Sequence, residues 1–431
     1  MQYFFILGKN PTLSKAEIEA VLEKAEVSAF ALASAKTSKA SADKRSLKSE
    51  VFGKILILDI EKELDIEWLN SRLGGTVKIG KILDKIEKLE EFEDKFFELV
   101  LFGAGKAFFG FSLYSLSTAI NVAKFQPKIN AMAMDIKARL REEKQVNSRY
   151  VVSREPELSS VIVAKNKLLK NGAEICFFFT NEPSFAKASE GKEILFGQTL
   201  AVQQFEEFGA RDFARPGRDD LSGMLPPKLA RIMVNLAQIK PEALILDPFC
   251  GSGTILQEAL VLGYSNLIGS DNSDKAVSDS LKNLDWLFEK SKVESLSREA
   301  ASRYAGKVEV IKLDVKDLSL KFKPNSIDAI ITEPYLGPAM RGNESQAQIE
   351  KTIEGLEVLY LTAFVQFAKV LVKGGKVVMV FPIYNLKNTQ SKIEILTQIE
   401  KLGFAKVNKE ELVYFREKQF VRREIVIFKK I

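Results

Sequence analysis

One segment of the chain combines the residue types that a cofactor-binding loop needs. The segment Asp247-Pro248-Phe249-Cys250-Gly251-Ser252-Gly253-Thr254 follows an apolar run and precedes a helical pattern. Its two glycines let the backbone approach a ligand closely, and the start of the helix presents free N–H groups. About one strand-helix-strand unit later, Asp271 ends a second apolar run. A carboxylate at that spacing suits the two hydroxyls of a ribose, so we expect a nucleoside cofactor.

Charge and spacing separate two classes of cofactor. The dinucleotide fingerprint needs a third glycine, which the sequence Gly-Ser-Gly-Thr-Ile-Leu lacks. An acid also opens the loop at Asp247, where it would repel a pyrophosphate but would attract the ammonium group of S-adenosylmethionine (AdoMet). The sequence therefore favours AdoMet as the cofactor.

The string Asp-Pro-Phe-Cys-Gly-Ser-Gly-Thr resembles the first motif of class I AdoMet-dependent methyltransferases that act on amino groups of nucleobases. The residues that this resemblance assigns to the cofactor are Asp247, Pro248, Gly251, Gly253, Asp271, Asn272, Asp314 and Val315. The resemblance implies that the loop lines the methionine part, that Asp271 holds the ribose and that Asp314-Val315 borders the adenine. For Asp314 an alternative stays open, namely a loop acid that caps a turn.

A second segment, Thr332-Glu333-Pro334-Tyr335, follows the fourth apolar run of this region. It resembles the Asp/Asn-Pro-Pro-Tyr/Phe motif of the same enzymes, with Glu333 in place of the Asp/Asn and Tyr335 in place of the second proline. In that motif a side-chain oxygen and a backbone carbonyl accept the two hydrogens of a nucleobase amine, and an aromatic ring stacks on the flipped base. We predict Glu333, Pro334 and Tyr335 as the catalytic residues; the alternative is a turn without a catalytic role.

The composition excludes several other chemistries. The chain has 431 residues and no histidine, which excludes Ser-His-Asp and Cys-His systems and histidine-ligated metals. Its two cysteines, Cys176 and Cys250, cannot form a Cys-only zinc site, so we expect no metal. Cys250 lies inside the cofactor loop without a base to activate it, and we interpret it as a small packing residue. Direct transfer from a sulfonium needs neither a histidine nor a covalent intermediate.

The surrounding pattern predicts the elements that hold these segments. From about residue 224, apolar runs alternate with helical segments, which predicts a parallel sheet covered on both faces, a Rossmann-like doubly wound α/β fold. The expected strands are 243–247, 266–271, 308–314, 327–332 and 376–382, and the expected closing antiparallel hairpin is 411–416 with 424–429. The first 185 residues mix strand-like runs, one of them at 97–102, with helices, one of which we expect to be capped by Ser14. They predict an α+β region.

These patterns predict an N-terminal α+β region at 1–185, a linker at 186–218 and a methyltransferase domain at 219–431. Residues 29–49 and 184–192 are rich in small residues and lysine, and we interpret them as surface insertions. The longest apolar runs are shorter than the roughly 20 residues of a membrane span. The chain opens without the basic leader of a signal peptide, so we expect a cytoplasmic protein that does not bind a membrane.

The segments outside the two motifs narrow the resemblance to the tRNA guanine-N2 methyltransferases that modify position 10. Arg215-Pro216 followed by Leu225-Pro226-Pro227 is similar to the start of their catalytic domain, and the runs 73–80 and 108–114 resemble their THUMP RNA-binding region. The resemblance implies that tRNA is the partner and that the THUMP module grips its acceptor end. Candidate phosphate contacts are Lys165, Lys167, Lys170, Arg211, Arg215 and Arg218, and the alternative for each is a solvated surface charge.

The net charge of +6 permits a nucleic-acid partner without requiring one. Besides methylation of tRNA, two hypotheses stay open. One is a DNA amino-methyltransferase, and the other is a non-catalytic tRNA-binding protein with a degenerate methyltransferase domain. The sequence also leaves open whether one or two methyl groups are added, whether a small activator subunit takes part, and the oligomeric state.

Overall fold

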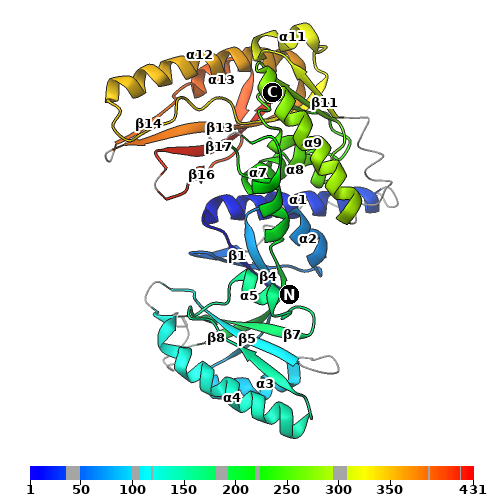
Figure 1. The fold of residues 1–431 in the computed structure, drawn as a ribbon, viewed down its shortest axis with the longest axis vertical. Helices are drawn as coiled ribbons and strands as arrows, with labels where there is room; N and C mark the ends of the chain where they lie inside the picture. Colours follow the sequence, from blue (N-terminus) through cyan, green and yellow to red (C-terminus); the bar gives the residue numbers. More distant parts are fainter. Residues whose placement is uncertain are drawn as a thin grey trace. The chain divides into compact units, whose positions relative to one another are not determined.

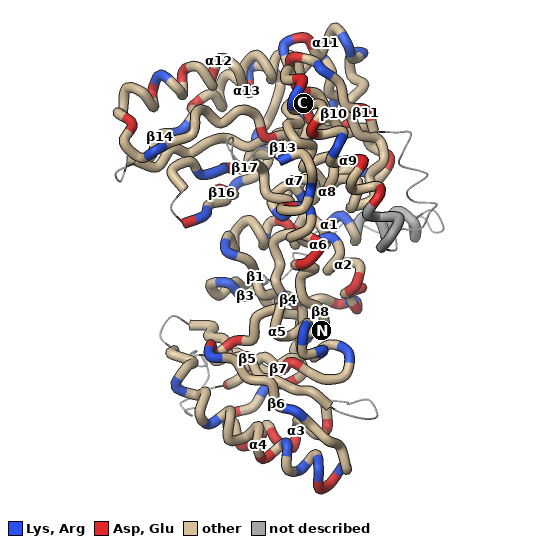
Figure 2. Tube along the Cα trace, in the orientation of Figure 1, with Lys and Arg blue, Asp and Glu red and all other residues tan. Residues whose placement is uncertain are grey.

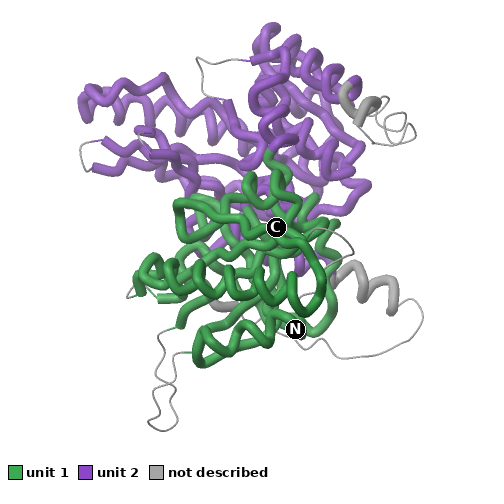
Figure 3. The backbone as a smooth tube through the Cα atoms, turned by 60° about the horizontal axis from the view of Figure 1, so that its bottom comes forward, with its two compact units in different colours: residues 1–11, 40–71, 76–205 green, residues 12–39, 72–75, 206–431 purple. Residues whose placement is uncertain are grey.

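The structure, a computed structural model, describes residues 1–34, 49–99, 107–117, 120–180, 193–218, 224–294, 308–386, 389–417 and 419–431. The chain forms two compact units (Figure 3). Unit 1 comprises residues 1–11, 40–71 and 76–205, and unit 2 comprises residues 12–39, 72–75 and 206–431. Basic and acidic residues are interspersed along the described chain (Figure 2), which agrees with the small net charge.

Unit 2 is built on a sheet with the order β11-β10-β9-β12-β13-β17-β15 (Figure 1). The pairs from β11 to β13 are parallel, whereas β17 is antiparallel to β13, β15 and β16. Its strands are β9 (Ile245–Asp247), β10 (Leu267–Asp271), β11 (Val308–Lys312), β12 (Ile327–Thr332), β13 (Leu371–Leu386), β14 (Thr389–Lys392), β15 (Phe404–Lys406), β16 (Leu412–Tyr414) and β17 (Val421–Lys430). The predicted doubly wound sheet and its closing antiparallel hairpin are confirmed.

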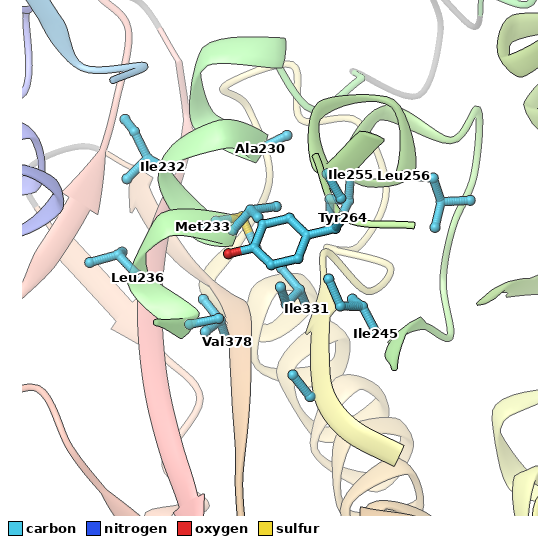
Figure 4. Packing of buried hydrophobic residues seen from close by; sticks show 14 of the residues in the cluster. Ala230, Ile232, Met233, Leu236, Ile245, Ile255, Leu256, Tyr264, Ile331 and Val378 are labelled. Atoms are coloured by element: carbon cyan, nitrogen blue, oxygen red, sulfur yellow. The ribbon is translucent and has the colours of Figure 1, made fainter. Parts of the chain in front are cut away.

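Two hydrophobic layers cover this sheet because neighbouring strand residues point to opposite faces. Ile245 and Val378 pack with α7 and α8 in one layer, several of whose residues Figure 4 shows, whereas Leu246 and Val377 pack with α12 in the other. The helices are α1 (Pro11–Ser34), α6 (Phe205–Gly209), η3 (Ala210–Ala214), α7 (Pro227–Ala237), α8 (Thr254–Val261), α9 (Asp274–Glu294), η4 (Val315–Asp317), α11 (Leu318–Lys321), α12 (Gln346–Val370) and α13 (Leu396–Lys401). The near-continuous apolar character of the strands follows from burial on both faces.

The strand order reverses between β9 and β12. From β9 the chain adds β10 and then β11 on one side, and it returns to the other side of β9 with β12. Ligands of open α/β sheets bind at the carboxyl ends of the strands on either side of such a reversal. The segments that follow β9 and β12 are the two motifs that the sequence singled out.

Unit 1 is a mixed sheet with the order β2-β3-β1-β4-β8-β7-β5-β6. Apolar residues of α3 and α4 pack on one face of this sheet, against β5 and β7. The elements are β1 (Gln2–Leu7), β2 (Ser49–Phe52), β3 (Ile55–Asp59), α2 (Ile66–Arg72), β4 (Thr76–Ile86), η1 (Leu89–Glu91), α3 (Phe92–Leu99), β5 (Ala107–Ser115), η2 (Val122–Phe125), α4 (Gln126–Glu143), β6 (Ser148–Val151), α5 (Ser160–Lys165), β7 (Gly172–Phe179) and β8 (Ile194–Val202). The predicted α+β character is confirmed.

Several local predictions differ from the structure. The strand expected at 97–102 is wrong where it is described, because Phe92 and Phe96 recur at helical spacing and bury the face of α3. Ser14 does not cap a helix, because α1 begins at Pro11 and the Ser14 hydroxyl donates to the carbonyl of Gly75. The linker expected at 186–218 contains β8, which lies between β4 and β7 in the sheet of unit 1. Residues 35–48 of the first predicted insertion, and all of the second, lie outside the described residues.

Candidate active site

A cavity of about 1000 Å³ lies in unit 2 at the carboxyl ends of β9, β10 and β12. Acidic side chains from these three strand ends, Asp247, Asp271 and Glu333, line it together. Of the other predicted site residues, the cavity is also lined by Gly251, Asn272, Pro334 and Tyr335. The sequence therefore located three of the four acidic side chains that line the cavity, the fourth being Asp279.

The glycine loop, residues 248–253, follows β9 and is hydrogen-bonded to the end of β10. Gly253 has a φ of 77°, and a Cβ atom there would collide with the Ser280 hydroxyl, so the loop requires glycine at this position. The Asp271 carboxylate accepts hydrogen bonds from the backbone N–H groups of Gly251 at 3.1 Å and Ser273 at 3.0 Å. Asp271 thus positions the loop besides facing the cavity.

Asp247 is almost fully buried beneath the loop. Its carboxylate accepts a hydrogen bond from the Thr332 hydroxyl at 2.7 Å, which joins the ends of β9 and β12. Burial raises the pKa of Asp247 to about 7, an effect that the hydrogen bonds from Thr332 and Phe249 partly oppose and the negative charges of Asp271 and Glu333 reinforce. A cationic group that entered the cavity would stabilise its charged form.

The Glu333 carboxylate forms an ion pair with the guanidinium group of Arg423 on β17. The Arg423 Nε donates to Glu333 Oε1 at 2.6 Å, and its Nη2 lies 3.5 Å from Oε2. Burial raises the pKa of the Glu333 carboxyl above its usual range, and the adjacent guanidinium opposes that rise. The sequence missed Arg423, which lies 90 residues away in the chain.

Two tyrosines hold the segment that follows Glu333. The Tyr360 hydroxyl donates to the carbonyl of Tyr335 at 3.0 Å, and the Tyr384 hydroxyl donates to the carbonyl of Leu336 at 2.6 Å. Gly337 lies against the Tyr384 hydroxyl with a φ of 92°, a position that a side chain would block. This fixed backbone leaves the Tyr335 ring 59% exposed where it lines the cavity.

A second aromatic side chain, Phe420, also lines the cavity and is 38% exposed. Aromatic side chains in such positions are suited to stack on a flat base. The sequence offered one signal for Phe420, an aromatic residue directly before the last apolar strand, and it was not recognised.

Four predicted cofactor residues do not line the cavity. Pro248 and Gly253 are buried residues of the loop, and Val315 is buried in the layer that packs with α12. The Asp314 carboxylate accepts a hydrogen bond from the N–H of Lys316 at 3.1 Å, as expected of an acid that caps a turn. A contact of Asp314 with adenine stays a prediction. Cys250 is buried in the hydrophobic core, which confirms its interpretation as a packing residue.

Two of the predicted phosphate contacts are wrong. Arg211 is buried and donates through Nε to Glu258 at 2.5 Å, and Arg215 is buried and donates to the Thr254 hydroxyl at 2.6 Å. Burial makes them structural cations rather than surface charges. Arg218, by contrast, is exposed.

Glu258 also accepts from Arg231 Nε at 2.8 Å, so one fully buried carboxylate of α8 holds two buried guanidinium groups.

The described residues contain no group of three or more acidic or cysteine side chains that could hold a metal ion. In the described part of the chain, none of the helices combines the length and the apolar character that crossing a membrane requires.

Comparison with known proteins identifies the family of this domain. Residues 215–393 match the family model described as RMKL-like, methyltransferase domain. The chain is 32% identical over 181 residues to the tRNA (guanine(10)-N2)-dimethyltransferase of Methanocaldococcus jannaschii, covering 41% of this chain and 47% of that protein. It is 33% identical over 142 residues to the probable tRNA (guanine(10)-N2)-dimethyltransferase of Methanothermococcus thermolithotrophicus, covering 33% of this chain and 78% of that protein. The chain belongs to the tRNA (guanine-N2-)-methyltransferase family.

The match to the M. jannaschii member of this tRNA (guanine-N2-)-methyltransferase family spans only about half of its length, 47%. Among solved structures, TrmN from Thermus thermophilus superposes with a TM-score of 0.50 at 17% identity over the whole of both chains. At that identity the likeness supports the fold.

AdoMet is the cofactor of this methyltransferase family, and the cavity residues fit it. Asp247 offers a carboxylate to the ammonium group, Gly251 lets the backbone approach the ligand, and Asp271 offers a carboxylate to the ribose hydroxyls. The cavity volume, about 1000 Å³, leaves room for a nucleobase beside the cofactor. These residue roles are proposals that the following two predictions test.

AdoMet affinity is expected to depend on the protonation of Asp247. The pKa of Asp247 is about 7 without cofactor, and only its ionised form pairs with an ammonium group, so binding lowers this pKa and releases a proton. The affinity for AdoMet should therefore increase as the pH rises to about 7. Below that value it should fall about tenfold for each unit by which the pH is lowered. Calorimetric titration between pH 5.5 and 7.5 measures this, with Asp247→Asn as the variant that should lose the slope. An equal dissociation constant at pH 5.5 and 7 in the wild type would exclude this role.

Asp271→Ala is expected to weaken AdoMet binding about 10–100-fold, because it removes charge-assisted hydrogen bonds to the ribose and the carboxylate that holds the N–H of Gly251. The matched control is Asp274→Ala, whose carboxylate lies just beyond β10, is 82% exposed and pairs with Lys312. Calorimetry should find the control within about twofold of wild type. An Asp271→Ala protein with wild-type affinity would remove the ribose assignment.

Proposed function

We propose that this protein transfers a methyl group from AdoMet to the exocyclic N2 amine of a guanine in tRNA, with position 10 as the target nucleotide. The observation that carries the proposal is the position of Glu333. Its carboxylate lines the same cavity as Asp247 and Asp271, and the Thr332–Asp247 hydrogen bond fixes the end of β12 beside the proposed cofactor loop.

The chain's own residues prepare the amine for direct transfer. The lone pair of an exocyclic amine is delocalised into the ring, so the nitrogen must be drawn toward a tetrahedral state before it can attack. We assign the two hydrogens of the amine to a Glu333 carboxylate oxygen and to the carbonyl of Pro334, which precedes the two carbonyls anchored by Tyr360 and Tyr384. The sulfonium of bound AdoMet supplies an activated methyl group. The proton that leaves the amine passes to Glu333 or to water.

Tyr335 and Phe420 are the proposed stacking partners of the flipped base. Both are partly exposed and line the cavity, which suits rings that contact a base entering from outside. Stacking between aromatic rings fixes the orientation of the plane of the base. Hydrogen bonds to the edge of the base then fix its rotation within that plane.

Unit 1 is the proposed tRNA-binding module, which grips the acceptor end. The side chains of Lys165, Lys167 and Lys170, at the end of α5 and in the turn after it, are exposed and available to phosphates. Cytoplasmic location stays a prediction from the sequence, and the participation of a small activator subunit stays open.

A transfer assay with a choice of substrates tests the proposed function. The pure protein is incubated with methyl-labelled AdoMet and unmodified tRNA, and separately with double-stranded and single-stranded DNA. Label in tRNA alone supports the proposal, whereas label in DNA favours the DNA amino-methyltransferase. AdoMet and tRNA binding without transfer to either would make the protein a binding module, in line with its altered Glu333-Pro334-Tyr335 motif.

A further inference from the structure

The hairpin that β16 and β17 form, residues 412–423, combines aromatic rings with basic side chains. Its sequence, Leu-Val-Tyr-Phe-Arg-Glu-Lys-Gln-Phe-Val-Arg-Arg, holds three aromatic residues and four basic residues against one acid. The structure describes all of these residues except residue 418. The two strands pair antiparallel, with Tyr414 opposite Arg423. Of the three rings, the proposed methyl transfer assigns a role to Phe420 alone.

Two arginines of the hairpin lie on aromatic rings. The Arg422 guanidinium lies 5.1 Å from the centroid of the Phe415 ring. Arg416 donates through Nε to the Tyr414 hydroxyl at 2.8 Å, and its guanidinium lies 5.9 Å from the centroid of that ring. Within the described part of the chain, neither guanidinium forms an ion pair with a carboxylate. Because an aromatic ring has no net charge, both arginines keep a positive charge that an outside anion can neutralise.

The hairpin adjoins the cavity of the proposed active site. Gln419 and Phe420, in the turn between the two strands, line the cavity. The carbonyl of Phe420 accepts a hydrogen bond from the N–H of Asn385 at 2.7 Å, and its ring packs closely against Gly342. These contacts fix the turn at the cavity wall. A target base that stacks on Phe420 therefore leaves its phosphates and the next nucleotides of the strand beside the hairpin.

A further cation lies near Arg416. Burial lowers the pKa of Lys228, at the start of α7, and the positive charge of Arg416 lowers it further, against the opposing effect of Asp212. Like charges held near each other repel, and a bound phosphate relieves that repulsion. Stacking rings beside positive charge are the two features by which proteins bind single-stranded nucleic acids.

We propose that the β16–β17 hairpin binds the nucleotides that flank the target guanosine. Phe415 and Arg422 form a stacking surface for a neighbouring base, and Arg416 binds a phosphate of the same strand. This rests on the proposed function, because it concerns the strand whose guanosine is methylated. It adds an RNA contact on unit 2 to the one proposed for unit 1.

The experiment measures the binding of tRNA at several salt concentrations. Labelled unmodified tRNA is titrated with the intact chain, and fluorescence anisotropy gives the dissociation constant. Arg416→Gln is expected to weaken binding about fivefold near physiological salt. It should also lower the slope of log Kd against log salt concentration by about 0.7–0.9, the value for one lost phosphate contact.

Phe415→Leu separates stacking from charge, because leucine keeps the apolar bulk but lacks the flat ring. Its affinity for tRNA should fall about 5–100-fold while the salt slope stays that of the wild type. Phe415→Tyr, which keeps the ring, should retain the wild-type affinity.

The matched control for the charge is Lys323→Gln. Lys323 is exposed and precedes β12, so it lies at the amino end of a strand whose carboxyl end faces the cavity. Its replacement removes one positive charge and should change neither the affinity for tRNA nor the salt slope. Calorimetric titration of AdoMet should give the wild-type affinity in every variant, which shows that unit 2 is folded.

Wild-type affinity and salt slope in both Arg416→Gln and Phe415→Leu would overturn the inference. If these variants fail to fold, cross-linking of the wild type decides. With 4-thiouridine on either side of guanosine 10, we expect cross-links to residues 412–423, and cross-links confined to other segments would overturn the inference. Methyl transfer to tRNA by the wild type is measured separately. Its absence overturns the proposed function, whereas its presence with no contribution from the hairpin overturns this inference alone.

Discussion

Replacing Glu333 with glutamine is expected to lower kcat about 10²–10³-fold and to leave AdoMet affinity within about threefold of wild type. Glutamine keeps the shape of the side chain but replaces one acceptor oxygen with a donor and removes the negative charge. The amine then loses the acceptor that draws its nitrogen toward a tetrahedral state. Single-turnover kinetics on tRNA, together with calorimetric titration of AdoMet, separates the two effects.

Two further variants make this prediction specific. Glu333→Asp keeps the charge but withdraws the carboxylate by one methylene, so its rate should lie between those of the wild type and the glutamine variant. Glu350→Gln, on the exposed face of α12, removes the same charge away from the cavity and should leave kcat unchanged. If Glu333→Gln kept more than a third of the wild-type kcat, Glu333 would have no part in catalysis.

The largest loss of stability is expected at Glu258, a residue that the sequence did not single out. Glu258→Gln should lower the free energy of unfolding by about 3–5 kcal/mol, because it leaves the buried guanidinium groups of Arg211 and Arg231 without their anion. Chemical denaturation, followed by a fluorescence or circular dichroism signal from unit 2, gives the difference.

The control for this prediction is Glu207→Gln. Glu207 lies 3.8 Å from the same Arg211 but is 50% exposed, so solvent screens the pair and its loss should cost about 0.5 kcal/mol or less. Equal midpoints for wild type and Glu258→Gln would show that this buried cluster does not contribute to folding.

The parallel half of the fold and three of the cavity's four acids were predictable because their signals are local. Apolar runs of strand length alternate with helices, and Asp247, Asp271 and Glu333 each follow directly after such a run. Since the carboxyl ends of parallel strands meet at one edge of a sheet, three separate segments could be placed together from the sequence.

The features that the sequence missed depend on contacts between distant segments. Arg423 joins Glu333 only because β17 is inserted antiparallel beside β13, and no spacing rule foretells the partner of an arginine. The same holds for Arg211 and Arg215, whose sequence context resembles a surface basic patch but whose guanidinium groups are buried. Residues 97–99, the end of the helix over Phe92–Leu99, were assigned to a strand because phenylalanine also favours strands.

The geometry of the cavity explains how the proposed reaction could proceed in a chain without histidine. In the proposed mechanism Glu333 can accept the proton of the amine, and burial raises the pKa of its carboxyl. A carboxyl with a raised pKa is a stronger base than one in water, which suits it to accept a proton near neutral pH. The chemistry that we propose therefore needs no imidazole.

The central claim, methylation of the N2 amine of a tRNA guanine, is tested most directly by nucleoside analysis of the product. The wild-type protein is incubated with unmodified tRNA and AdoMet that carries a deuterated methyl group, and the tRNA is digested to nucleosides for mass spectrometry. We predict the deuterated label in N2-methylguanosine or N2,N2-dimethylguanosine, and its loss when guanosine 10 is replaced by adenosine. Label in any other nucleoside, or in none, would contradict the claim.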